Sequence, residues 1–254
     1  HGACPRTVDP GAVARRFDTW LPGATLAGVL GMIQGRRIVI TGGGGFIGVS
    51  LAKRLADANA VVLCDLDFEH NAYAYSSVRD HPNVRRAQVD ILDADAVKAA
   101  CSGAQVLIHL AGVVGVQQVL MNTSRTLAVT IQGTQHALDA VESKALERFL
   151  YLSTSEVYGA HAYDAVETDP TLVGPNDDPR WCYAASRVAA EHLVQSYYRE
   201  RGLPTVILRP FNVFGPGRIG DHAVLRLIYQ ALNGEPLTVH NEGAAIRAWC
   251  FIDD

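Results

Sequence analysis

From residue 36 onward, short apolar runs rich in Val, Ile and Leu alternate with longer stretches of helical periodicity. The apolar runs predict strands at 36–41, 60–65, 86–91, 104–112, 148–154 and 204–211. The helical patterns cover 45–58, 93–101, 124–141, 180–202 and 222–233, with two short strands expected after the last of them. Continuous runs of β-branched residues are typical of strands that helices cover on both faces. The pattern therefore predicts an α/β fold built on a doubly wound parallel sheet with right-handed crossovers.

Composition and charge narrow the class of protein. Of the 254 residues, 48% are hydrophobic and 19% are charged, and the net charge is −4. No cluster of Lys and Arg is present, so we expect no nucleic-acid partner. The longest apolar stretch, 20–33, is interrupted by Pro22 and several glycines, and we expect it to pack on the domain rather than enter a membrane.

The five cysteines are odd in number, scattered, and form no CxxC pair. This pattern predicts neither a disulfide framework nor a bound metal. It fits a reducing, cytoplasmic environment.

A glycine loop joins the first predicted strand to the first predicted helix. In "ITGGGGFIG" (40–48), Gly42, Gly45 and Gly48 form a GxxGxxG pattern. Glycines at such a junction allow a tight turn and close approach of a pyrophosphate to the helix N-terminus. The pattern predicts a Rossmann-type dinucleotide site, with Phe46 and Ile47 in the same loop.

An acidic residue is placed to bind the adenosine ribose. Asp65 ends the second predicted strand, where a carboxylate can accept hydrogen bonds from the ribose diol. No Arg or Lys lies between Arg54 and Arg79 to receive a 2′-phosphate, which favours NAD over NADP. Asp90 is either an adenine contact or a strand-end cap. The remaining residues expected at the cofactor are Ile91, Leu110, Ala111 and Pro210.

Six segments in order carry a resemblance to a known family. They are "TGGGGFIG" (41–48), "HLAG" (109–112), "QGT" (132–134), "STSEVYG" (153–159), "YAASR" (183–187) and "RPFNVFGPG" (209–217). Together they resemble the extended short-chain dehydrogenases/reductases, in particular the NAD-dependent sugar epimerase/dehydratase family. Uronate decarboxylases and uronate epimerases are the most similar members.

The resemblance implies a division of the chain into three parts. Residues 1–34 form an N-terminal extension, residues 35–211 an NAD-binding Rossmann domain, and residues 212–254 part of a nucleotide-sugar-binding lobe. Relatives continue beyond the position of Asp254, so we expect this small C-terminal substrate lobe to be incomplete. Relatives also dimerise through two long helices, which predicts a homodimer through 124–141 and 183–199.

The resemblance also assigns the site residues. Thr154 and Tyr183 match the catalytic hydroxyl and the catalytic phenol, and Asn212 and Arg247 match substrate-binding residues. The implied chemistry oxidises C4 of a nucleotide sugar to a transient ketone with NAD. Tyr183 takes the C4 hydroxyl proton and Thr154 orients the same oxygen.

Residues 155 and 156 bear on which reaction follows the formation of the 4-ketone. Sugar 4,6-dehydratases resemble this chain but carry Asp where Ser155 stands, which weakens the dehydratase interpretation. Glu156 is expected to act near C5 and C6 of the sugar, with Ser155 beside the substrate. The favoured reaction is therefore decarboxylation or epimerisation of a UDP-uronic acid, and 4,6-dehydration is the alternative.

Arg187 departs from the family pattern, which has Lys at this position. Lysine contacts the nicotinamide ribose and stabilises the ionised tyrosine. Arginine keeps the charge, but its planar fork directs hydrogen bonds differently. Arg187 is therefore both a catalytic and a cofactor-binding candidate. A catalytically impaired NAD-binding sensor or scaffold protein is the second alternative.

Overall fold

The computed structural model describes residues 33–69, 72–141, 145–160, 164–220, 222–239 and 247–254. The chain divides into two units, residues 1–35 and 36–254. The predicted N-terminal extension, 1–34, lies almost entirely outside the described residues. None of the described helices is long and apolar enough to cross a membrane.

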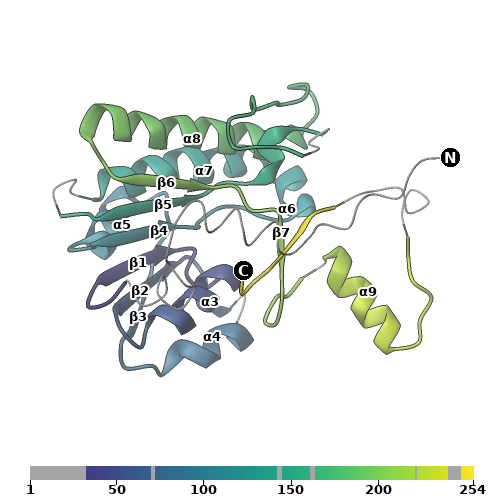
Figure 1. Cartoon of the computed structure of the whole chain (residues 1–254), viewed down its shortest axis with the longest axis horizontal. Helices are drawn as coiled ribbons and strands as arrows, with labels where there is room; N and C mark the ends of the chain where they lie inside the picture. The colour runs from purple at the N-terminus through teal and green to yellow at the C-terminus, as the bar shows by residue number, and fades with distance from the viewer. Residues whose placement is uncertain (1–32, 70–71, 142–144, 161–163, 221, 240–246) are drawn as a thin grey trace. The chain divides into compact units, whose positions relative to one another are not determined.

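Six parallel strands form the main sheet in the order β3-β2-β1-β4-β5-β6, as Figure 1 shows. The strands are β1 (Arg37–Thr41), β2 (Ala60–Asp65), β3 (Val84–Gln88), β4 (Val106–His109), β5 (Arg148–Leu152) and β6 (Thr205–Leu208). Every neighbouring pair is parallel, and β1 lies between β2 and β4. This is the strand order of a doubly wound dinucleotide-binding fold, and it confirms the predicted fold class.

Helices cover both faces of this sheet. They are α3 (Phe46–Leu55), α4 (Ala72–Arg79), α5 (Ala94–Cys101), α7 (Thr123–Asp139) and α8 (Trp181–Arg201), while the short helix α6 (Val116–Met121) directly precedes α7. Side chains of α3 and α4 share one buried cluster with β1, β2 and β4. Side chains of α5, α7 and α8 form the cluster on the opposite face. Strands β1, β2 and β4 are thus buried on both sides, as their continuous hydrophobic runs predicted. The edge strand β6 differs, because its Val206 and Leu208 are 36% and 44% exposed.

Of the six main-sheet strands, β2 alone has its predicted bounds, and α4 and α6 were not predicted. Strand β3 covers 84–88 instead of 86–91, so Asp90 lies beyond it rather than at its end. Strand β4 ends at His109, and the chain from Leu110 onward leaves the sheet. Because parallel strands end at the same edge, these shortened ends leave loop residues free to line a site there.

A second, two-stranded sheet follows the main one. Strand β7 (Asn212–Phe214) pairs in parallel with β8 (Trp249–Phe251), and helix α9 (Ala223–Leu232) lies between them in the sequence. Of the two short strands expected after this helix, the described residues contain β8. These elements lie within residues 212–254, and the assignment of this segment (the small lobe) to substrate binding stays a prediction.

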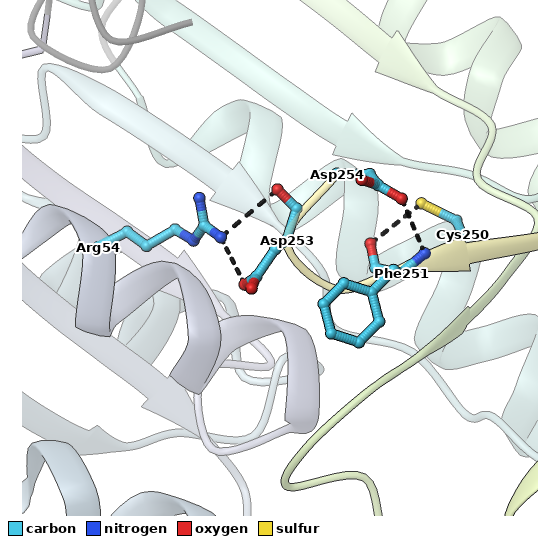
Figure 2. A network of polar contacts seen from close by, with 5 residues as sticks. All are labelled: Arg54, Cys250, Phe251, Asp253 and Asp254. Atoms are coloured by element: carbon cyan, nitrogen blue, oxygen red, sulfur yellow. Dashed lines mark hydrogen bonds and ion pairs between the residues drawn. The ribbon is translucent and has the colours of Figure 1, made fainter. Parts of the chain in front are cut away.

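The turn after β8 is attached to helix α3. Nη2 of Arg54 lies 2.5 Å from Oδ1 of Asp253, and Figure 2 draws this ion pair. The backbone N–H of Phe251 donates to the carboxylate of Asp254 at 3.2 Å, which closes the turn. The small sheet is therefore tied to the helix that begins at the glycine loop.

Candidate active site

A cavity of about 690 Å³ lies at the carboxyl ends of the main-sheet strands. Thr41, Asp65, Leu110 and Leu152, which end or follow four of these strands, line it. Ligands of doubly wound sheets bind at this edge. The cavity is therefore the candidate active site.

The glycine loop forms one wall with its backbone packed tightly. Gly42 has φ +67°, and a β-carbon there would lie 2.8 Å from the backbone nitrogen of Ala111. At Gly48, a β-carbon would lie 2.7 Å from the carbonyl oxygen of Gly42. Helix α3 starts at Phe46 with no side-chain cap, so its first N–H groups have no side-chain acceptor at that cap. This cradle fits the pyrophosphate of a dinucleotide.

Asp65 lies next to this loop at the end of β2. Its Oδ2 accepts a hydrogen bond from the N–H of Gly44 at 2.9 Å, which fixes the carboxylate against the loop. Burial raises the pKa of Asp65, while hydrogen bonds from backbone N–H groups, Gly44 first, oppose the rise. A carboxylate held in this position can accept hydrogen bonds from a ribose diol.

Asp90 caps a turn beyond β3 and also lines the cavity, and its contact with adenine stays a prediction. Its Oδ1 accepts from the N–H of Leu92 at 3.0 Å, as a turn cap does. Its Oδ2 lies 3.8 Å from Nη2 of Arg125, and both residues line the cavity. The cavity brings together all the predicted cofactor residues, namely Gly42, Gly45, Phe46, Ile47, Gly48, Asp65, Asp90, Ile91, Leu110, Ala111, Tyr183, Arg187 and Pro210.

A 3₁₀ turn, η2 (Ser155–Tyr158), follows β5 and contains most of the polar segment "STSEVYG" (153–159). The Oγ1 of Thr154 accepts a hydrogen bond from the N–H of Glu156 at 3.2 Å, so the hydroxyl hydrogen remains available. Thr154 and Glu156 line the cavity, whereas Ser155 is not among the lining residues. Its N–H donates to the carbonyl of Pro210 at 3.0 Å.

Ser153 supports the assignment of a polar ligand to this cavity. It lines the cavity, and its Oγ is buried without a hydrogen-bond partner among the described residues. Buried hydroxyls are normally satisfied. The orphaned oxygen therefore fits a bound polar group beside the strand end.

Glu156 has a perturbed carboxyl group. It lines the cavity although the residue as a whole is exposed. Partial desolvation raises its pKa, and the nearby charges of Arg180 and Arg247 oppose the rise. Arg180 also lines the cavity, whereas Arg247 is exposed and is not among the lining residues. Glu156 and Arg180 together offer an acid and a cation at one end of the site.

Tyr183 and Arg187 lie one turn apart on α8. The guanidinium carbon of Arg187 is 5.1 Å from the ring centre of Tyr183. Its Nη1 donates to the carbonyl of Leu152 at 2.8 Å and to the hydroxyl of Tyr151 at 3.3 Å. Burial lowers the pKa of Arg187, but the phenols of Tyr183 and Tyr151 outweigh this and raise it above its ordinary value. A permanent cation therefore lies against the candidate catalytic phenol.

A buried polar network supports this cation from below. The ring of Tyr151 stacks on the ring of His109 with centres 5.8 Å apart. His109 hydrogen-bonds Thr41 at 2.6 Å through Nδ1 and Thr134 at 3.2 Å through Nε2. Burial, and secondly the charge of Arg187, lower the pKa of His109 to about 3. The imidazole is therefore neutral and acts as a structural link between strand ends and α7.

The predicted substrate residue Asn212 lines the cavity at the start of β7. Its Nδ2 donates to the carbonyl of Ala248 at 3.1 Å, which leaves its side-chain oxygen as an acceptor. The amide thus links the first residue of β7 to the residue that precedes β8.

Two residues that the sequence interpretation did not select also belong to the site. Gly112 faces the guanidinium of Arg187, and Arg218 lines the cavity against Phe46. The "HLAG" segment contains the glycine, and the arginine directly follows "RPFNVFGPG". Their position in or next to these motifs could have indicated that both residues belong to the site. The contacts of Gly112 with Arg187 and of Arg218 with Phe46 do not follow from local spacing.

Comparison with known proteins identifies the family. A family model described as the NAD dependent epimerase/dehydratase family matches residues 38–254. The match includes every described element from β2 onward and nearly all of β1.

Two curated relatives differ in activity. A dTDP-D-glucose 4,6-dehydratase of Dictyostelium discoideum is 30% identical over 86% of this chain and 53% of the relative. A UDP-N-acetyl-alpha-D-glucosaminuronate decarboxylase of Bacillus cytotoxicus is 30% identical over 86% of this chain and 68% of the relative. The chain thus spans from about half to two thirds of the length of these relatives.

A solved structure is similar in fold. It is UDP-glucuronic acid 4-epimerase from Bacillus cereus in complex with UDP-glucuronic acid and NAD. It has a TM-score of 0.74 and 29% identity, covering 85% of this chain and 69% of that chain.

Proposed function

The chain belongs to the NAD-dependent epimerase/dehydratase family, and from this premise we propose that it modifies a nucleotide sugar through a transient 4-keto intermediate. The favoured substrate is a UDP-uronic acid, and the favoured outcome is decarboxylation or epimerisation. The observation that carries the proposal is the shared cavity, which Thr154, Glu156, Tyr183 and Arg187 line together with the glycine loop.

NAD, when bound, supplies the hydride acceptor and donor for C4 of the sugar. Tyr183 takes the proton of the C4 hydroxyl as general base. The hydroxyl of Thr154 donates a hydrogen bond to the same oxygen, since its own oxygen already accepts from Glu156. The charge of Arg187 stabilises the phenolate that starts the reaction.

The charges around Glu156 support a uronic acid. Arg180 lies close enough to oppose the rise in the pKa of Glu156, and it lines the cavity. A cation in this place complements a sugar carboxylate. A 4-keto uronate is a β-keto acid, which loses CO2 readily, while rotation and re-reduction of the ketone give the 4-epimer. Glu156 moves or positions a proton near C5 and C6.

The absence of an acidic residue at position 155 weighs against 4,6-dehydration. Ser155 cannot deliver a proton to a departing C6 hydroxyl as a carboxylic acid does. Its N–H is bound to the carbonyl of Pro210. A dehydratase remains the alternative because one of the relatives has that activity by name.

Product analysis tests the proposal. The protein is incubated with NAD and UDP-glucuronate, UDP-glucose or dTDP-glucose, and the products are analysed by mass spectrometry and chromatography. Loss of CO2, or unchanged mass with a new retention time, from UDP-glucuronate is expected. Loss of water from a glucose nucleotide would instead establish the dehydratase. NAD binding without any product would favour the sensor.

Two tyrosine variants on the same helix make the test specific. Tyr183→Phe should lower kcat by about 10²- to 10⁴-fold, the usual contribution of general acid–base catalysis. Tyr198→Phe changes a phenol that is 56% exposed and should leave kcat unchanged. Equal activity of Tyr183→Phe and the unaltered protein would remove Tyr183 from the mechanism.

The proposal includes a homodimer through α7 and α8, which the family resemblance suggests. The two helices lie side by side on one face of the sheet in Figure 1. Light scattering at several concentrations, with and without NAD, measures the mass directly. A monomer under all conditions would contradict this part of the proposal.

A further inference from the structure

Arg218 reaches from the small lobe to the glycine loop. It follows β7 in a turn closed by its own N–H, which donates to the carbonyl of Gly215 at 3.2 Å. Its guanidinium carbon lies 5.6 Å from the ring centre of Phe46, the first residue of α3. Both residues line the cavity. A cation of the lobe therefore lies beside the helix end that carries the pyrophosphate cradle.

This cation has no internal counter-charge in the described part of the chain. Its Nε is buried without a hydrogen-bond partner, and no carboxylate there forms an ion pair with it. Removing an unpaired charge from water is unfavourable, and burial accordingly lowers the pKa of Arg218. An arginine kept in this state is suited to an anionic ligand that enters the cavity.

The position of the guanidinium decides which anion fits. The predicted sugar contacts, Thr154 and Tyr183, come from the turn after β5 and from α8. Arg218 instead packs on Phe46, whose backbone belongs to the glycine loop. We propose that Arg218 binds the pyrophosphate of NAD from the side of the lobe, across from the N-terminal amides of α3. The inference rests on the NAD-binding part of the proposed function and not on the identity of the sugar.

The small lobe is also attached to α3 by a contact that does not involve Arg218. The turn after β8 is tied to the other end of α3 by Arg54 and Asp253 (Figure 2). That pair is largely exposed, with side-chain exposures of 36% and 60%, so it contributes little by itself. With NAD bound, Arg218 would add an attachment at the first turn of α3. Cofactor binding should therefore stabilise the lobe against the Rossmann domain.

Binding measurements with NAD-free protein test the inference. The affinities for NAD and for adenosine are compared by calorimetry in the unaltered protein, Arg218→Gln and Arg218→Lys, and in Arg199→Gln as an exposed-arginine control. Arg218→Gln should weaken NAD binding about 10- to 100-fold, the worth of a charge-assisted hydrogen bond. Arg218→Lys should fall in between. Adenosine, which lacks phosphate, should bind all four proteins equally.

Hydrogen exchange gives a readout independent of affinity. At saturating NAD, amides of 212–218 and 249–254 should exchange more slowly in the unaltered protein, and this protection should be reduced in Arg218→Gln. Failure of the unaltered protein to bind NAD would overturn the proposed function itself. Unchanged NAD affinity and unchanged protection in Arg218→Gln would overturn this inference alone.

Two further outcomes would also contradict the inference. Weaker binding of UDP with unchanged binding of NAD would assign Arg218 to the substrate diphosphate. Equal losses for adenosine and NAD would show that the substitution disturbs the fold rather than a phosphate contact.

Discussion

The Nη2 atom of Arg187 occupies the space in which residue 112 would carry a side chain. A β-carbon built on Gly112 would lie only 2.3 Å from that nitrogen. The guanidinium cannot easily withdraw, because Nη1 is bound to the carbonyl of Leu152 and to Tyr151. The arginine that replaces the family lysine thus depends on a glycine from a different strand end.

This dependence predicts that substitutions at positions 112 and 187 are energetically coupled. Gly112→Ala should lower the free energy of unfolding by about 1–3 kcal/mol, as overpacking of a filled site does. In the Arg187→Lys variant, Gly112→Ala should lower the free energy of unfolding by less, because lysine has no atom equivalent to Nη2 of Arg187. Denaturant titration of both single variants and the double variant measures the coupling. Additive losses would show that the contact is not the cause.

The position of Arg187 predicts the turnover of its variants. Its guanidinium carbon lies 5.1 Å from the ring centre of Tyr183, so removal of the charge should weaken the electrostatic support of the proposed base. In Arg187→Gln, kcat at a fixed pH should fall by about 10²- to 10³-fold, the usual cost of removing one preorganised electrostatic partner. Arg187→Lys retains a charge and should lower kcat less. Unchanged kcat in Arg187→Gln would show that the cation does not support the base.

His109 predicts the pH dependence of stability. Its pKa in the folded protein is lowered to about 3, whereas an unfolded histidine titrates near ~6.5. The unfolded chain therefore binds the extra proton first, and the stability contributed above pH ~6.5 is lost as the pH falls toward 3. The slope from this one group approaches about 1.4 kcal/mol per pH unit.

Substitution of two histidines isolates this effect. His109→Gln should flatten the decline of the free energy of unfolding between pH 6 and pH 4 (about the interval in which only the unfolded histidine is charged). His192→Gln changes an exposed histidine on α8 and should leave the curve as it is. Parallel curves for His109→Gln and the unaltered protein would exclude His109 as the source.

Local spacing predicted the cofactor part of the cavity lining, because the glycine loop directly precedes a helix and Asp65 ends a strand. Tyr183 and Arg187, one helical turn apart, were assigned by the family resemblance, and their catalytic roles stay predictions. The third strand was misplaced because its own residues, VRRAQ, are mostly exposed and polar. The apolar residue Ile91 was predicted to end this strand, but it packs on α7 instead. A β-carbon at Gly133 of α7 would lie 2.8 Å from the side chain of Ile91.

The contacts that refine the site could not be read from the sequence in this way. Arg218 meets Phe46, and Arg187 meets Gly112, across long sequence separations and between different elements. Such pairs depend on strand order and loop course, which hydrophobic periodicity does not encode. The residues were visible in the sequence, but their partners were not.

A partly buried ion pair next to the η2 turn gives the last prediction. Arg209 forms two hydrogen bonds with Glu191, at 3.0 and 2.7 Å, and its guanidinium carbon lies 4.9 Å from the ring centre of Tyr158 in η2. Arg209→Met leaves the 6%-exposed Glu191 without its partner and should lower the free energy of unfolding by about 3–5 kcal/mol. Arg209→Met with Glu191→Leu should recover most of this loss of stability, because neither charge is then buried alone.

Glu147→Gln, at an exposed ion pair, is the control and should change the free energy of unfolding by less than about 1 kcal/mol. Since the pair supports the turn that carries Thr154, the double variant should regain stability without regaining full kcat; a double variant as unstable as Arg209→Met would contradict the argument.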